Sequence, residues 1–486
     1  MTSDRKETSL DPEDWEAFRI SAHAMLEAAL NRLEGAGEGR VWTPLPEDDK
    51  ARYRLPLPRE GLGSDVVRAR MTELLPHGVG NTHPRFFGWV HGAGTPSNMM
   101  AEITAAAMNA NLGGRDHGAI YVEKQVVAWC REMFGFPETA SGLVVSGTSI
   151  ATVIALKAAR DRALGFESRR VGVEGAGLVG YTSEETHSCV ARAFDILGLG
   201  SDALRKIPTD EAFRIDLAAL KDTIAEDRAK GLTPFALIGT AGAVNVGSID
   251  DLDALAGIAG DAGLWFHVDG AFGATAILSA EKRPLLKGLE RADSLAFDFH
   301  KWMQVNYDAG FVLIRSEEDH RRAFSERPDY LVATTRGISA ANPWPTEYGP
   351  ELSRGFRALK IWAQIAEHGT EKLGQVVDQN CAQATYLGEK VVAQAETELM
   401  APVALNVCCF RVVRKGVSGD ELDTLNTEVV LRLQESGIAA PSTTKIHGRT
   451  AIRVNITNHR TRMADMDVLL DAVLRTAREV SSAAAA

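Results

Sequence analysis

The stretch Ser294-Leu295-Ala296-Phe297-Asp298-Phe299-His300-Lys301-Trp302 decides the fold of this chain of 486 residues. Its apolar run, residues 294–299, predicts a buried strand that leads into a turn carrying Lys301. An upstream run, Leu264-Trp265-Phe266-His267-Val268-Asp269-Gly270-Ala271, predicts a second buried strand that ends at a carboxylate and small residues. The chain therefore offers one amine and one carboxylate at the ends of two neighbouring strands.

This pair of charged groups matches the needs of pyridoxal 5'-phosphate. A lysine or an aspartate beside a strand is usually a solvated loop charge, so neither residue alone indicates a site. Together, Lys301 can form a Schiff base with the cofactor's aldehyde, and Asp269 can keep its pyridine nitrogen protonated, so that the ring accepts electrons. Schiff-base formation needs the neutral amine, and burial beside a cationic cofactor is expected to lower the pKa of Lys301.

The sequence motifs around the lysine also resemble those of a known family. The strings H-V-D-G-A at 267–271, F-H-K-W at 299–302, N-Y-D at 306–308 and F-R-A-L-K-I-W at 356–362 are similar to signatures of group II pyridoxal-phosphate-dependent amino-acid decarboxylases. That group includes aromatic-L-amino-acid, histidine and glutamate decarboxylases. The resemblance runs from about His83 to the end of the chain. It implies a fold-type I enzyme that acts as a homodimer on a small amino-acid substrate.

The composition is that of an ordinary globular protein. Hydrophobic residues make up 45% and charged residues 24%, and the net charge of −12 argues against a nucleic-acid or anionic-membrane partner. The five cysteines lack metal-ligand spacing, so no metal is expected and a reduced, cytoplasmic location fits best. The first residues lack the apolar core of a signal peptide, and the longest uncharged run, 231–249, contains proline and glycine. We therefore expect a soluble protein.

The pattern along the chain predicts three regions. Residues 1–90 are expected to form an N-terminal helical segment, in which Asp11 and Pro12 start an amphipathic helix that ends at Gly35. Residues 91–378 alternate helical stretches with short apolar strands, which predicts a mostly parallel sheet covered by helices and a ligand site at the strands' carboxyl ends. Residues 379–486 are expected to form a small α+β domain. In the resembled family the N-terminal helices pack across the dimer partner.

The resemblance assigns further residues to the ring of the cofactor. Ala271 matches the small residue under the ring. His187, in Thr186-His187-Ser188, matches a histidine that stacks on the ring and lies near the substrate carboxylate; without the family it would read as a surface histidine. His300 is expected to support the lysine or the phosphate.

The cofactor phosphate is predicted at the start of a helix. Ser146-Gly147-Thr148-Ser149 precedes the helical stretch to about Leu164, and backbone amides at a helix N-terminus bind anions. Such a start is usually only a cap, but its position matches the family's phosphate loop, so Thr148 and Ser149 are the predicted contacts. Asp298 matches a position near that phosphate, where an ionised carboxylate would need a donor as a bridge.

The substrate pocket departs from that of aromatic-specific relatives. By spacing, Asn81 and Asn111 stand where those relatives carry aromatic side chains, while Trp89 and Val90 remain apolar. His91, Arg115 and His117 add polarity. Gly242-Ala243-Val244 replaces a Gly-Thr-Thr string whose hydroxyl supports the ring. These features predict an aromatic or polar-aromatic substrate.

The proton donor and the reaction outcome stay open at this point. The family's mobile loop carries a tyrosine that protonates the substrate carbon after CO2 leaves, but Tyr330 and Tyr348 do not match its position, which falls near Pro345. An aldehyde-forming synthase therefore competes with simple decarboxylation. A decarboxylase of an acidic amino acid, an aminotransferase or lyase on the same fold, and a non-catalytic family member also fit these residues.

Overall fold

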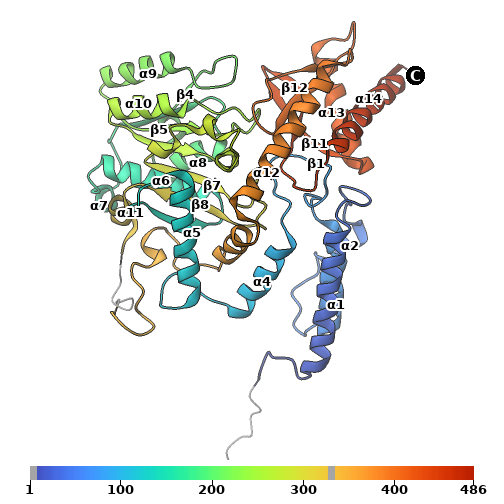
Figure 1. Ribbon diagram of the computed structural model, residues 1–486, viewed down its shortest axis with the longest axis horizontal. Coiled ribbons are helices and arrows are strands. Elements are labelled where there is room, and N and C mark those ends of the chain that lie inside the picture. The colour runs from blue at the N-terminus through green and yellow to red at the C-terminus, as the bar shows by residue number, and fades with distance from the viewer. Residues whose placement is uncertain (1–7, 327–333, 486) are drawn as a thin grey trace, which may run out of the picture.

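The computed structural model describes residues 8–326 and 334–485, and a seven-stranded sheet lies at its centre (Figure 1). In spatial order its strands are β2 (Ser141–Val145), β8 (Gly310–Ile314), β7 (Ser294–Asp298), β6 (Trp265–Asp269), β5 (Thr233–Thr240), β3 (Leu178–Ser183) and β4 (Leu204–Ile207). Strand β8 is antiparallel to both neighbours, and the pairs from β7 to β4 are parallel. The mostly parallel α/β architecture expected from the sequence is confirmed.

Helices cover both faces of this sheet. Along β2, Leu143 and Val145 belong to one hydrophobic cluster and Val144 to another, because successive side chains of a strand point to opposite faces. The first face is covered by α6 (Thr148–Ala163), α8 (Ser188–Ile196) and α11 (Glu317–Phe324), and the short helix α7 (Ser168–Val171) follows α6 in the chain. The other is covered by α5 (Gly118–Phe134), α9 (Leu217–Ala229), α10 (Leu252–Ala262) and the start of α12 (Ala358–Val392).

A second, five-stranded sheet forms the small domain. Its order is β1 (Phe86–Phe87), β11 (Ala440–Ile446), β12 (Arg449–Asn455), β10 (Val407–Val412) and β9 (Thr397–Leu399), packed with α13 (Gly419–Ser436) and α14 (Met463–Ala485). Strand β1 comes from the N-terminal region and pairs in parallel with β11, Phe86 opposite Ala440. The long helix α12, which changes direction at the non-helical Gly369, runs between the two sheets (Figure 1).

The N-terminal helices α1 (Trp15–Glu34), α2 (Glu47–Arg52) and α3 (Ser64–Glu73) extend away from both sheets, and α4 (Pro96–Met108) packs against α12 (Figure 1). Helix α1 begins later than Asp11 predicted, because the Asp14 carboxylate accepts hydrogen bonds from the amides of Glu16 and Ala17 at 2.9 and 3.0 Å. Short 3₁₀ turns complete the fold: Leu75–His77, Ser201–Ala203, Gly273–Leu278, Arg283–Leu286, Leu289–Arg291 and Pro345–Glu347. None of the helices in the described ranges is both long and apolar enough to cross a membrane.

A buried ion pair holds the free edge of β2. Arg354, 1% exposed, donates to both carboxylate oxygens of Glu123 at 2.6 and 3.0 Å and to the carbonyls of Leu112 and Val144. Glu123, on α5, also accepts the Val144 amide at 3.2 Å. One guanidinium thus joins α5, β2 and the segment before α12.

Removing one partner of this pair should destabilise the protein strongly. Arg354→Met leaves the Glu123 carboxylate buried without its cation, which costs about 3–5 kcal/mol in the free energy of unfolding. Lys230→Met is the matched control, because its pair with Glu226 is exposed and worth less than about 1 kcal/mol. Urea unfolding measures both variants, and equal midpoints would contradict the role given to Arg354.

Candidate active site

A cavity of about 300 Å³ lies at the carboxyl ends of β5 and β6. The small domain and the segment after β1 close it from the other side. Its walls are Trp89, Val90, His91, His187, Thr240, Gly242, Val244, Asn245, Asp269, Ala271, Phe272, Lys301, Ser442, Thr443, Thr444 and Arg453. The parallel sheet produces this site, because parallel strands end at one common edge.

Lys301 follows the end of β7 and reaches this cavity with 22% of its side chain exposed. Its Nζ lies 3.0 Å from the Asp298 Oδ2. Burial lowers the pKa of Lys301, but the charge and hydrogen bond of Asp298 and the charge of Asp269 outweigh burial, so the pKa is raised. A lowered pKa was expected from the sequence, because that expectation placed a cationic cofactor beside the amine. The observed direction is the opposite, since two carboxylates lie there instead.

Asp269 is the last residue of β6 and is 3% exposed. Its carboxylate accepts the Ala271 amide at 3.2 Å and the Cys189 thiol at 3.7 Å. Burial raises the pKa of Asp269, against the opposing charge of Lys301. A buried carboxylate with so few donors favours a cationic partner in the cavity, which a protonated pyridine nitrogen would supply.

Asp298 connects the lysine to the start of α6. Its Oδ1 accepts the Thr148 amide at 2.7 Å, which is the donor bridge that an ionised carboxylate needs here. His300 lies beside it, with Nε2 at 3.7 Å from Asp298 Oδ2 and Nδ1 accepting the Ala309 amide at 3.0 Å. Ser149 is exposed in the first turn of α6. The helix start, the lysine and His300 therefore lie around one carboxylate.

The loop at this helix start packs closely against β8. A Cβ on Gly310 would lie 2.3 Å from the Cα of Gly147, so only glycine fits there. The Thr148 hydroxyl is buried and has no hydrogen-bond partner among the described residues. An anion held by the amides of the α6 N-terminus would have such a hydroxyl nearby.

His187 caps the start of α8 and lines the cavity. Its Nδ1 accepts the Cys189 amide at 3.2 Å, which fixes the ring beside Asp269. Burial and the charge of Lys301 lower the pKa of His187, with Asp269 acting in the opposite direction. A neutral ring is therefore available to cover one face of a bound group.

The residues present fit pyridoxal phosphate. The cavity holds an amine for the aldehyde, a buried carboxylate for the ring nitrogen, and a nearby helix N-terminus for the phosphate. Ala271 lies on its wall as a small residue. Thr240 is opposite Asp269 in the sheet register, and its buried hydroxyl has no partner among the described residues. Among residues 8–326 and 334–485, no cluster of three or more metal-binding side chains occurs.

The two asparagines predicted for the substrate pocket do not line this cavity within one subunit. The Asn81 side-chain amide donates to the Gly92 carbonyl at 2.6 Å, and the Asn111 side chain accepts the amides of Gly113 and Arg354, each at 2.9 Å. Both serve local turns, and neither is among the residues that line this cavity. Trp89, Val90 and Val244 do line it, and Val244 has no hydroxyl.

Sequence reasoning missed the contribution of the small domain. Arg453 of β12 donates through Nη1 to the Trp89 carbonyl at 2.7 Å and through Nε to the Asn245 carbonyl at 3.1 Å. Its Nη2 is buried without a partner among the described residues. Ser442, Thr443 and Thr444 of β11 complete this wall. Nothing local in the sequence marks these residues, because only the packing of the two domains brings them to the cavity.

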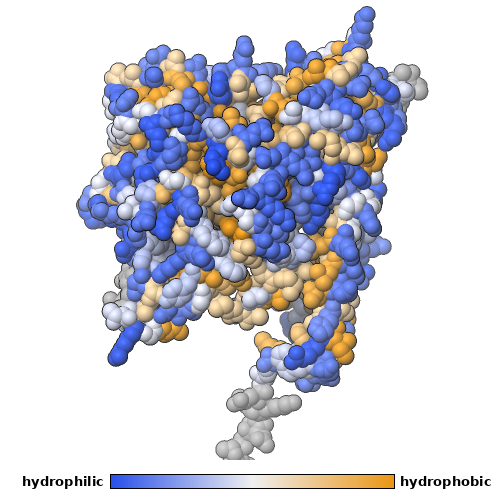
Figure 2. Space-filling model, viewed as in Figure 1, coloured by the Kyte–Doolittle hydropathy of each residue, from blue (hydrophilic) through white to orange (hydrophobic). Residues whose placement is uncertain are grey.

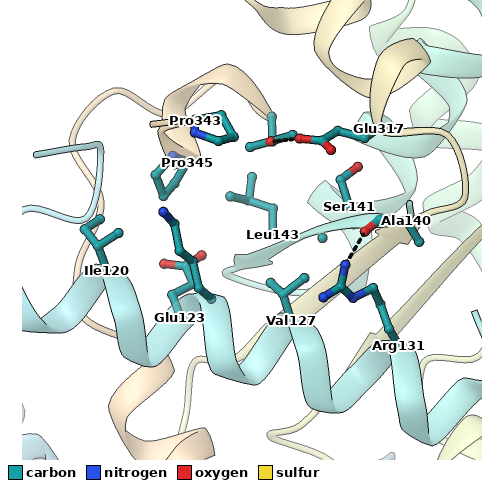
Figure 3. Close-up of a pocket in the computed structure, with 13 residues that line it drawn as sticks. Ile120, Glu123, Val127, Arg131, Ala140, Ser141, Leu143, Glu317, Pro343 and Pro345 are labelled. Carbon is teal, nitrogen blue, oxygen red and sulfur yellow. Dashed lines mark hydrogen bonds between the residues drawn. The ribbon is translucent and has the colours of Figure 1, made fainter. Parts of the chain in front are cut away.

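Tyr348 lies at a different cavity of about 340 Å³ along the edge of β2 (Figure 3). Apolar residues such as Val127, Leu143 and Pro345 line that cavity, and the Tyr348 hydroxyl donates to Glu317 there. Tyr348 is therefore not among the residues that line the cavity of Lys301. Tyr330 lies outside the described residues.

The comparisons with known proteins identify a conserved domain and similar enzymes. The pyridoxal-dependent decarboxylase conserved domain matches residues 46–413. An aromatic-L-amino-acid decarboxylase from Bacillus atrophaeus is 33% identical over 446 residues, 87% of this chain and 91% of that protein. A phenylacetaldehyde synthase from Arabidopsis thaliana is 28% identical over 408 residues, 81% of each protein.

The fold of this chain is similar to that of a solved structure. The glutamate decarboxylase domain of diaminobutyrate-pyruvate transaminase and L-2,4-diaminobutyrate decarboxylase from Vibrio parahaemolyticus superposes with a TM-score of 0.84 at 26% identity, over 96% of this chain and 97% of that one. The resemblance seen in the sequence motifs is confirmed. This chain belongs to the family of pyridoxal-dependent decarboxylases.

Proposed function

We propose that this protein removes the α-carboxyl group of an aromatic or polar-aromatic L-amino acid and forms the amine and CO2. Its family makes it a pyridoxal-phosphate-dependent carboxy-lyase. The observation that carries the proposal is the meeting of Lys301, Asp269 and His187 in one cavity. An aromatic substrate is supported by the relative from Bacillus atrophaeus and by Trp89 and Phe272 on the cavity wall.

The bound cofactor supplies an electron sink for the bond that breaks. We assign the rest of the work to side chains of this chain. Asp269 would hold a proton on the pyridine nitrogen, because a buried carboxylate stabilises a cation beside it. Asp298 positions the Lys301 amine, and His187 would cover the ring.

A second candidate is decarboxylation of an acidic amino acid, and Arg453 favours it. This guanidinium is 3% exposed, lines the cavity and has one nitrogen without a partner among the described residues. Arginine suits a carboxylate because its nitrogens form paired hydrogen bonds. A pair with a side-chain carboxylate persists through the reaction, whereas a pair with the departing α-carboxylate would stabilise the ground state.

An aldehyde-forming synthase is the candidate that keeps the same cofactor but changes the product. The relative from Arabidopsis thaliana carries that activity in its name, and Tyr348 is not among the residues that line the cavity. The intact His187 favours simple decarboxylation instead. The two outcomes differ in their products, since only the synthase consumes dioxygen, which it reduces to hydrogen peroxide while it forms an aldehyde, ammonia and CO2.

The test of the proposal is a substrate screen with holoenzyme. Each of the twenty amino acids is supplied, and CO2, amine, aldehyde, ammonia and peroxide are measured. Release of CO2 and amine in equal amounts from an aromatic amino acid supports the proposal. The best rates with glutamate or aspartate would support the acidic candidate, and aldehyde with ammonia the synthase. Amino transfer without CO2 would contradict the whole assignment.

Lys301 should carry the cofactor. Borohydride reduction of the holoenzyme fixes an imine as a stable amine, and peptide mapping should then find the pyridoxyl label on Lys301. Lys301→Ala should remove that label while the protein stays folded. Label on any other lysine would show that the cofactor is held elsewhere.

Asp269→Asn should leave a folded but nearly inactive enzyme. A neutral amide cannot hold the ring nitrogen protonated, and losing about 4 kcal/mol of transition-state stabilisation slows turnover roughly a thousandfold. Asp293→Asn is the matched control, because Asp293 accepts the Phe266 amide at 2.8 Å at the opposite end of the sheet. Turnover per bound cofactor is the measurement. Wild-type rates in Asp269→Asn would show that Asp269 does not contact the pyridine ring.

We also propose a homodimer. Helix α1 has 20 residues and none of them is buried, while Trp15, Phe18 and Ile20 are 53%, 40% and 64% exposed. Figure 2 shows hydrophobic side chains at the surface in this region. Most of a helix's stability in a protein comes from packing its apolar face, so a second subunit is the partner that we expect to cover it.

Sedimentation should give about twice the subunit mass of 52.4 kDa. Deletion of residues 1–60 should yield aggregated or cofactor-poor protein, because the surface that the segment covers in the dimer becomes exposed. A fully active monomer would contradict the proposed assembly. A cytoplasmic location is a further proposal, supported by five buried cysteines that are all free thiols.

A further inference from the structure

We propose that His91 selects the substrate's side chain by hydrogen bonding to an O–H or N–H group on its ring. This inference rests on the proposed amino-acid decarboxylation and goes beyond it, because it names the residue and the chemical group that decide which aromatic amino acid is preferred. It also gives the cavity the polar partner that Asn81 and Asn111 do not provide within a subunit.

The backbone at His91 is fixed against the lysine segment. The Thr457 hydroxyl donates to the His91 carbonyl at 2.7 Å, and the next amide, of Gly92, donates to the His300 carbonyl at 3.1 Å. A Cβ on Gly92 would lie 2.4 Å from the Lys301 carbonyl oxygen, so the two segments touch. The position of His91 is therefore tied to that of the catalytic lysine.

Aromatic side chains surround the His91 ring. Its centroid lies 5.5 Å from that of Phe86, 5.9 Å from Trp89 and 5.7 Å from Tyr307. Such contacts restrict the ring without satisfying its nitrogens. The ring is thus held on the cavity wall next to Trp89, where an aromatic substrate side chain would pack.

The His91 ring has no hydrogen bond to the described residues. Its Nδ1 is enclosed by protein, so Nε2 is the nitrogen that can meet a ligand in the cavity. Burial, followed by the charges of His300 and Lys301, lowers the pKa of His91, so the ring is neutral near pH 7. A neutral imidazole has one acceptor nitrogen, and Nε2 in that role suits a phenol O–H, an indole N–H or an imidazole N–H. An accessible acceptor on the cavity wall favours a ligand that supplies a donor.

Two other polar groups of this wall are less suited to a neutral donor. Arg453 can only donate, and its preferred partner is an anion. The Thr444 hydroxyl already donates to Asn245 Oδ1 at 2.7 Å. Thr443 also lies on the wall and is the natural comparison residue for His91.

Tyrosine and phenylalanine test the inference, because they differ by one hydroxyl. Wild-type holoenzyme should prefer tyrosine by at least about tenfold in kcat/KM. His91→Phe keeps an aromatic ring but has no acceptor, so the preference should fall to within about twofold, mainly through a higher KM for tyrosine. His91→Asn should retain part of the preference. Spectral titration of holoenzyme with each amino acid gives the same ratio from binding.

Thr443→Val is the matched control and should keep the tyrosine preference. If Thr443→Val loses it while His91→Phe keeps it, the side-chain partner is Thr443 and the inference is overturned. Equal losses of kcat for both substrates in His91→Phe would show a positioning role instead and also overturn it. The inference is also overturned if the wild-type enzyme prefers phenylalanine to tyrosine. Absence of CO2 from every amino acid would instead overturn the proposed function, and this inference with it.

Discussion

The Asp298 carboxylate is the contact on which the site depends. One oxygen accepts the amide at the start of α6 and the other pairs with the amine of Lys301. Asp298 ends a strand whose residues are all buried, so the sheet sets its position. Residues 148 and 301 are far apart in the sequence, and a single carboxylate gives them a fixed separation. The proposed phosphate site and the proposed Schiff-base amine therefore lie at a fixed separation, as the two ends of one cofactor require.

The same carboxylate also sets the electrostatics around the lysine. Its charge and hydrogen bond, together with the charge of Asp269, outweigh burial and favour the protonated Lys301 amine. The expectation from the sequence counted a cationic cofactor beside this amine, whereas the protein's own residues place two carboxylates there. This is the physical reason why the two directions of the pKa shift differ.

Much of the fold could be predicted because strands buried on both faces appear as unbroken apolar runs. The runs that became β6 and β7 ended at Asp269 and just before Lys301, and the parallel sheet brought those ends to one edge. Strand β1 was not predictable, since two residues show no periodicity and its partner lies over 350 positions away. A similar separation along the sequence explains why the role of Arg453 was not predicted, since its contact with Trp89 exists only in the folded chain.

The residues at the ends of the buried strands and the residues that the small domain and the segment after β1 bring to the cavity have different roles. Asp269, Asp298 and Lys301 lie at the ends of buried strands, where a change would disturb the core. His91 and Arg453 lie on a segment and a strand that meet over the cavity from opposite ends of the chain. Substitutions there can alter which side chain is bound without moving the groups that hold the cofactor. Relatives with one cofactor chemistry and different substrates are the expected consequence of this separation.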